Sequence, residues 1–128
     1  MKRSDVYIIR NDGSGKKAVK IKGYMFEKKG HWFTVRHRDP DEATHYKKWI
    51  ISDFVTGLIM TSTDSRLDDV PDALSEAMIG KLFEIYLAHA QYDVIEEYAQ
   101  MINEAMYMDN PENKLIDLLQ KDAGELFR

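Results

Sequence analysis

Apolar and polar residues in the first half of the chain form short runs, two of them clearly alternating, separated by residues that favour turns. The runs cover residues 6–10, 16–26, 31–38, 47–52 and 58–61. Residues 16–26 and 31–38 alternate with a period of two, which predicts β-strands with one buried and one wet face. Residues 6–10 and 49–51 are β-branched or apolar runs that also predict strands. Turn-forming residues at 11–15 (NDGSG) and 27–30 (EKKG) predict short loops. We therefore expect an antiparallel meander of about five strands.

The second half changes to a helical period, beginning with residues 71–90. Here apolar side chains cover most of the helical circumference, with Leu74, Met78 and Leu82 on one side and Ile79 and Phe83 on the opposite side. A helix of this kind is expected to be dry on both flanks. We predict that it begins with Pro71 in its first turn, after an aspartate cap, and lies across the sheet.

Two further helices are predicted after this central one. Asp93 and Glu96 are spaced as a capping box, which predicts an amphipathic helix from residue 93 to about 108. One uninterrupted helix over residues 72–108 remains an alternative, because no strong helix breaker separates the two segments. Residues 111–122 predict a third, short helix. The expected fold class is α+β, with the sheet first and the helices packed on it.

Length and composition restrict the class of protein. A chain of 128 residues without cysteine is expected to be a single domain of a reducing compartment. No apolar run approaches the roughly 20 residues of a membrane span, so we predict a cytoplasmic protein without a membrane partner. The four histidines and the acidic residues match no metal-binding spacing, and no nucleophile or nucleotide motif is present. We therefore expect no cofactor and no metal, and catalysis is not favoured.

Charge is distributed unequally between the two halves. Residues 1–50 contain 13 Lys+Arg and 6 Asp+Glu (+7), whereas residues 51–128 contain 5 and 16 (−11), which together give the net charge of −4. The expected basic sheet half is 1–62 and the acidic helical half is 63–128. Such an asymmetry indicates either a polyanionic partner or attraction between copies of the chain.

The wet face of the predicted sheet gathers cations around an indole ring, as in proteins that bind single-stranded nucleic acid. Residues predicted to form this face are Lys20, Lys22, Trp32, Arg36, Arg38, Lys47 and Lys48. The alternative is an ordinary solvated sheet face.

Apolar residues on the helices predict a second surface, for a partner protein or for the seam of a homodimer. Its predicted members are Ile79, Phe83, Leu87, Met101, Met106 and Tyr107.

Strand and turn residues at 22–26 (KGYMF), 32–35 (WFTV), 49–53 (WIISD) and 56–58 (TGL) carry a resemblance. Over about residues 20–62, the chain resembles small uncharacterised proteins of Gram-positive phages and mobile elements. The resemblance implies a non-catalytic accessory protein that binds a host macromolecular complex, for which counter-defence (anti-CRISPR-like) inhibition is one role. It identifies no functional residues. The alternative function is single-stranded nucleic-acid binding by the basic, aromatic sheet face.

Overall fold

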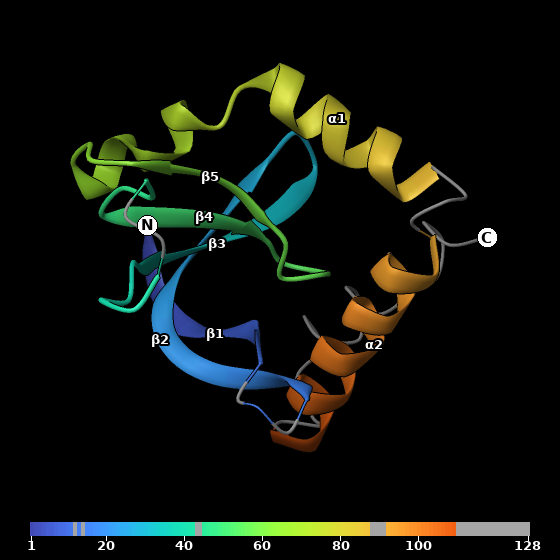
Figure 1. The fold of residues 1–128 in the computed structure, drawn as a ribbon. Helices are drawn as coiled ribbons and strands as arrows, with labels where there is room; N and C mark the ends of the chain where they lie inside the picture. Colours follow the sequence, from blue (N-terminus) through green and yellow to red (C-terminus); the bar gives the residue numbers. More distant parts are fainter. Residues whose placement is uncertain (12, 14, 43–44, 88–91, 110–128) are drawn as a thin grey trace.

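The computed structural model describes residues 1–11, 13, 15–42, 45–87 and 92–109 (Figure 1). Five antiparallel strands form one sheet in the order β1-β2-β3-β4-β5, and helices follow. The predicted α+β meander is thereby confirmed. The elements are β1 Lys2–Asn11, β2 Lys16–Lys28, β3 His31–His37, β4 Trp49–Asp53, β5 Ile59–Thr63, the 3-10 helix η1 Leu67–Ala73, α1 Glu76–Leu87 and α2 Tyr92–Asp109.

The turn between β2 and β3 is as tight as a hairpin allows. Lys28 pairs with His31, so only Lys29 and Gly30 form the loop, and both have positive φ (55° and 74°). Positive φ at both positions is the pattern of a type I′ turn, whose twist matches that of the two strands. The predicted turn at residues 27–30 is therefore confirmed, in a shorter form.

Gly23 lies where strand β2 passes from pairing with β1 to pairing with β3. Strand β2 pairs with β1 over residues 16–25 but with β3 only over residues 24–28, and Figure 1 shows that it is strongly curved. A Cβ atom on Gly23 would lie 2.4 Å from the carbonyl oxygen of Val35 and 2.9 Å from Cγ2 of Val6. The sequence left open a bulge or a close backbone approach at this glycine, and the structure shows the close approach.

The first helical segment starts differently from the prediction. Pro71 lies inside η1, whose N-cap residue Arg66 makes no side-chain cap bond, so an α-helix with Pro71 in its first turn is wrong. Helix α1 begins at Glu76, where the N–H of Met78 donates to Oγ of Ser75 (3.2 Å). Serine is a strong N-cap residue, and this local bond outweighs the preference of proline for a first helical turn.

Helix α1 has one wet flank, so the expectation of two dry sides is wrong. Its exposed residues follow a single stripe, namely Glu76, Ala77, Gly80, Lys81 and Glu84. The remaining described arc holds Met78, Ile79, Leu82 and Phe83, of which Ile79 and Leu82 are buried. Leu74, which extended the apolar pattern, belongs to the C-terminal cap of η1 rather than to α1.

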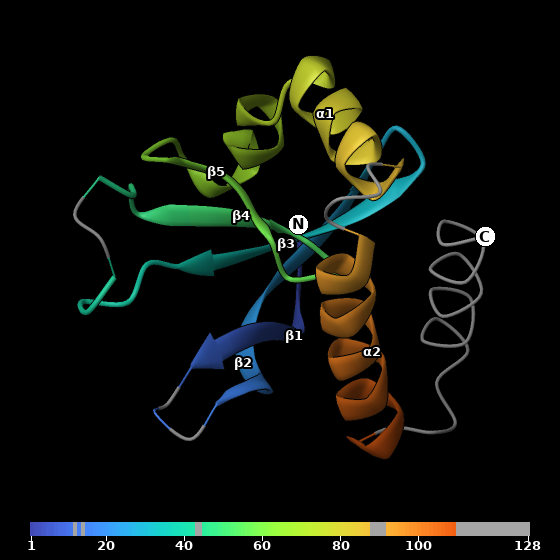
Figure 2. The ribbon, with the colours of Figure 1, turned by 45° about the vertical axis from the view of Figure 1, so that its right-hand side comes forward.

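Helix α1 also lies at one end of the sheet, where the β2–β3 turn is, rather than across its middle. Figures 1 and 2 show α1 next to the β2–β3 turn, and there Nζ of Lys29 pairs with Glu76 at 2.8 Å. Helix α2 instead runs beside the β1–β2 hairpin (Figure 2). Because α1 and α2 are separate and differ in direction, a single helix over residues 72–108 is also wrong. The predicted helix at 111–122 falls outside the described residues.

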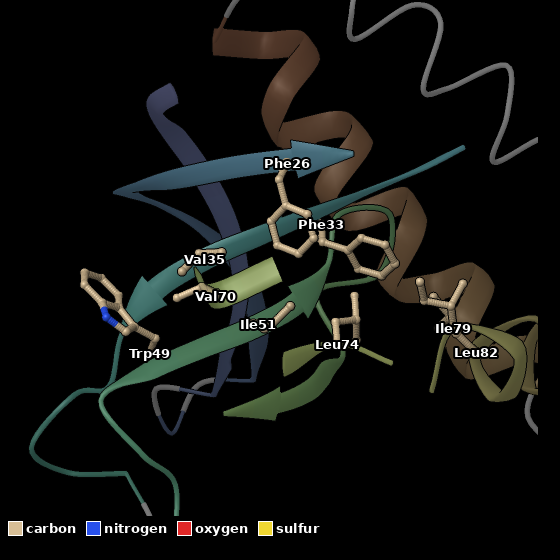
Figure 3. Packing of buried hydrophobic residues seen from close by; sticks show 9 residues of the cluster. All are labelled: Phe26, Phe33, Val35, Trp49, Ile51, Val70, Leu74, Ile79 and Leu82. Atoms are coloured by element: carbon tan, nitrogen blue, oxygen red, sulfur yellow. The ribbon is translucent and has the colours of Figure 1, made fainter. Parts of the chain in front are cut away.

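Two clusters of buried side chains hold the helices on the sheet. In the first, side chains from β2, β3 and β4 meet η1 and α1 (Figure 3), and its buried members are Phe26, Phe33, Val35, Trp49, Ile51, Val70, Leu74, Ile79 and Leu82. In the second, Ile102 and Met106 of α2 pack with Tyr7 and Phe54. Each helix is thus fixed to a different part of the sheet by hydrophobic burial.

Candidate functional site

Four of the predicted surface cations do reach solvent. Lys20 and Lys22 are exposed on β2, and Lys47 and Lys48 are exposed just before β4. Arg38 follows β3 and is half-buried. The lysines on β2 belong to the hairpin, whereas Lys47 and Lys48 lie at the start of an interior strand, so the structure places them on two separate elements of the sheet.

Trp32 does not form an exposed platform, which corrects the prediction for this residue. Its half-buried ring packs against the cluster around Tyr7, Phe54, Ile102 and Met106. Alternation along β3 correctly separates Trp32 from Phe33 and Val35, but it cannot show that α2 covers the second face. The indole therefore stabilises the packing of α2 rather than offering a stacking surface.

Arg36 is likewise part of the interior, with an exposed fraction of 6%. Its guanidinium forms a two-pronged ion pair with Glu42, in which Nη1 donates to Oε1 and Nη2 donates to Oε2. The guanidinium holds the pKa of the Glu42 carboxyl below its usual value of 4.5, and the backbone N–H of Asp39 adds to this effect. Arg36 thus holds the loop after β3 through Glu42. The prediction that Arg36 is a solvent-exposed phosphate contact is therefore wrong.

Two of the six residues of the predicted partner or dimer surface are interior as well. Ile79 is 3% exposed and Met106 is 5% exposed, each covered by the chain's own sheet. Phe83 and Met101 are half-buried, and the side chains of Leu87 and Tyr107 lie outside the described residues. Ile79 and Met106 therefore offer no apolar face to a second copy, and the homodimer stays a prediction.

The largest concentration of exposed positive charge lies on the β1–β2 hairpin. Exposed basic side chains occur on both of its strands, whereas Asp5 is the one exposed acidic side chain among the described residues from 2 to 22. The exposed cations are Arg3, Arg10, Lys16, Lys17, Lys20 and Lys22. Four of these, Arg3, Arg10, Lys16 and Lys17, were not predicted as site residues. The signal was present, because basic residues flank the NDGSG loop on both strands.

Arg10 and Lys17 show how densely the hairpin is charged. They are direct cross-strand partners in the β1–β2 register. Two like charges in this position destabilise an antiparallel pair. Arg10 is partly compensated by an ion pair with Asp39, and both side chains of that pair are about 40% exposed (43% and 40%).

Two other hairpin lysines have defined electrostatic partners. Nζ of Lys22 lies 2.7 Å from Oδ1 of Asp5 and lowers the pKa of that carboxyl. The ammonium of Lys16 donates to the hydroxyl of Tyr98 in α2, which raises the pKa of Lys16. Both lysines are exposed.

His31 and Asp53 form a buried polar connection that sequence inspection did not identify. Nε2 of His31 lies 2.7 Å from Oδ1 of Asp53, and the two residues are 8% and 0% exposed. The other carboxylate oxygen of Asp53 accepts from the hydroxyl (2.6 Å) and the backbone N–H (3.2 Å) of Thr56. Since both groups are shielded from solvent, this pair joins β3 to the end of β4 and the β4–β5 turn.

No family model, no curated protein and no solved structure matches the chain. Among the described residues, no group of three or more potential ligands could hold a metal ion. None of the helices that the structure describes is long and apolar enough to cross a membrane. The geometry of the hairpin is therefore the main guide to function.

Proposed function

We propose that this protein is a non-catalytic binding protein that binds single-stranded nucleic acid along its β1–β2 hairpin. The observation that carries the proposal is the hairpin's charge. Residues 2–11 and 16–22 contain seven Lys+Arg and one Asp. All six of the basic side chains that the structure describes there are exposed. Compared with the sheet face predicted from the sequence, the proposed surface keeps Lys20 and Lys22 and omits Trp32 and Arg36.

Phosphate recognition needs little more than this arrangement. Lysine and arginine neutralise backbone phosphates and release condensed counterions, so affinity falls steeply as salt is added. Such contacts position a strand without reading its sequence. By strand alternation in the β1–β2 register, one face of the hairpin carries four of the exposed cations, namely Arg3, Lys16, Lys20 and Lys22, and the opposite face carries Arg10 and Lys17. The four cations on the first face would contact the phosphates of a strand that runs along it.

The test is a fluorescence anisotropy titration of a labelled 20-nucleotide oligo(dT) between 50 and 200 mM salt. If four phosphates are contacted, the logarithm of affinity falls with the logarithm of salt concentration with a slope of about −3. The double variant Lys20→Ala/Lys22→Ala, which removes two cations from the same face of the hairpin, should reduce the magnitude of this slope by about 1.4. Lys81→Ala, which removes an exposed lysine from α1, is the matched control and should leave the slope unchanged. No binding at 50 mM salt, or equal slopes for all variants, would overturn the proposal.

A second candidate function is docking on a host protein complex through the acidic surface of η1. Asp68, Asp69 and Asp72 are all exposed there, and Glu84 is exposed on α1. A concentrated negative surface on the helices, separate from the positive hairpin, favours a partner with a basic face. The implied counter-defence role would require this kind of contact.

This second candidate has its own test. The triple variant Asp68→Asn/Asp69→Asn/Asp72→Asn should lose crosslinking to the host complex while oligo(dT) binding is retained. Crosslinking that is equally strong in the variant would remove the acidic surface from consideration.

A further inference from the structure

A cleft of about 410 Å³ opens where the hairpin, the β4–β5 turn and α2 converge. Ile9 and Lys16 of the hairpin form part of its wall, and Leu58 and Ile59 form another part. Tyr46, from the loop between β3 and β4, and Tyr98 of α2 complete the lining with Gly57. The volume falls within the range of about 300 to 1,000 Å³ that is usual for small-ligand sites.

Gly57 closes the cleft against the helix. Its φ is +72°, and a Cβ atom there would lie 3.1 Å from Cδ1 of Ile102 and 3.4 Å from Cγ1 of Ile9. Glycine therefore permits both the turn conformation and the close approach of the turn to α2. The cleft is thus built on packed elements, although its lining belongs to four separate segments.

The lining combines aromatic and aliphatic surface with one cation. Ile59 is the one large apolar side chain classed as exposed among the described residues, at 36%. Tyr46 and Tyr98 are half-buried. The ammonium of Lys16 lies 4.8 Å from the centre of the Tyr98 ring and also donates to its hydroxyl. An ammonium has three donors, so this one bond leaves Lys16 with capacity to bind an anion.

This chemistry suits a flat ring attached to a negatively charged group. A base stacks on aromatic side chains without regard to its identity, and a lysine binds the adjoining phosphate. Lys16 belongs both to the cleft and to the cationic hairpin. We propose that the cleft holds one unstacked base of the single strand whose phosphates lie along the hairpin. This inference rests on the proposed function and adds a base-binding site to it.

The experiment compares two labelled 20-mers of equal charge, oligo(dT) and an oligomer of abasic sites. Binding of a base predicts that oligo(dT) binds about tenfold more tightly than the abasic strand. Tyr46→Leu, which keeps apolar volume but removes the ring, should abolish this difference. Tyr46→Phe should retain it. Circular dichroism and thermal melting of both variants establish that they fold.

The outcomes separate this inference from the proposed function. If both strands bind equally tightly and with the same salt dependence, the hairpin binds phosphates and the cleft holds no base. If Tyr46→Leu folds and still prefers oligo(dT), the base lies elsewhere and the inference is overturned. If neither strand binds at 50 mM salt, the proposed function and the inference fail together.

Discussion

The β1–β2 hairpin and the β3–β4 pair are made of similar alternating strands, yet they face opposite environments. The hairpin presents six exposed cations, whereas β4 is buried along its whole length and only His37 of β3 is exposed. A basic residue therefore has a different role in each region. On the hairpin it can meet a partner, and in β3 it holds the protein together.

Removal of Asp53 should have the largest effect of the changes considered for the β3–β4 region. Asp53→Ala leaves His31, the N–H groups of Val55 and Thr56, and the Thr56 hydroxyl without their acceptor. Several orphaned buried donors should lower the free energy of unfolding by about 4 kcal/mol. Urea denaturation measures this loss. Asp41→Ala, at an exposed aspartate, is the control and should stay within about 0.5 kcal/mol of the parent.

Gly23→Ala tests the joint between the two regions. The added methyl group would press against a backbone carbonyl, which cannot rotate away as a side chain can. We expect a loss of about 3 kcal/mol in the free energy of unfolding, at the upper end of overpacking costs. Gly80→Ala is the matched control, because nothing lies within 4 Å of that position in α1. There the same change should stabilise the protein by about 0.5 to 1 kcal/mol. Equal effects at both positions would contradict the close approach at Gly23.

Arg36→Ala measures the structural role of a cation in β3. The substitution leaves the Glu42 carboxylate, whose side chain is 20% exposed, without its guanidinium partner. It should lower the free energy of unfolding by about 2 kcal/mol, which is below the range for fully buried pairs. Lys17→Ala on the hairpin should change the free energy of unfolding by less than about 0.5 kcal/mol. If Lys17→Ala destabilised the protein as strongly as Arg36→Ala, the contrast between the regions would be lost.

The same ion pair predicts a dependence on pH. Because Arg36 lowers the pKa of folded Glu42, the pair stabilises the protein above the unfolded value of about 4.5, and this contribution is lost as the pH falls through the folded pKa. Glu42→Gln should therefore show a smaller loss of stability than the parent between pH 7 and pH 3. If the free energy of unfolding of Glu42→Gln and of the parent fell equally between pH 7 and pH 3, the predicted role of the Arg36–Glu42 ion pair would be contradicted.

Thr34→Val should have the smallest effect. The hydroxyls of Thr34 and Ser52 are buried on paired positions of β3 and β4, and neither has a hydrogen-bond partner within the described parts of the chain. Replacing a buried hydroxyl that makes no bond is expected to be neutral or to stabilise by up to about 1 kcal/mol. Thr56→Val is the contrast, since it removes the hydroxyl that donates to Asp53, and it should destabilise. A clear loss in Thr34→Val would indicate that its hydroxyl is bonded.

The strands could be predicted well because alternation and turn chemistry are local. The NDGSG and EKKG loops follow from short stretches of chain. At Gly23 the sequence left a bulge and a close backbone approach open, because the approaching atoms belong to Val6 and Val35 on the neighbouring strands. The start of α1 was missed, although Ser75 is a visible cap signal, because Pro71 was given more weight. The wet flank of α1 was missed because Met78 and Leu82 were placed opposite Ile79 and Phe83. Neighbouring positions on a helix differ by about 100°, so these four residues form one apolar arc.

The candidate site was less predictable because it depends on what covers each face. Nothing in the alternation of β3 shows that α2 packs on Trp32 or that Glu42 folds back on Arg36. The cleft joins Lys16, Tyr46 and Tyr98 across most of the sequence, and no spacing relates them. The charge of the hairpin, by contrast, could have been read from the basic residues beside its loop.

Lys28 differs from the hairpin lysines in how it should respond to chemical labelling. Its ammonium donates to the carbonyl oxygens of Pro71 (2.8 Å) and Leu74 (2.7 Å) at the end of η1. Lys28 is also half-buried, whereas Lys17 and Lys20 are exposed. Because of this difference in exposure, an acylating reagent should modify Lys17 and Lys20 faster than Lys28 for as long as η1 packs on β2. Mass spectrometry of the labelled peptides thus measures whether η1 is packed on β2, without any mutation.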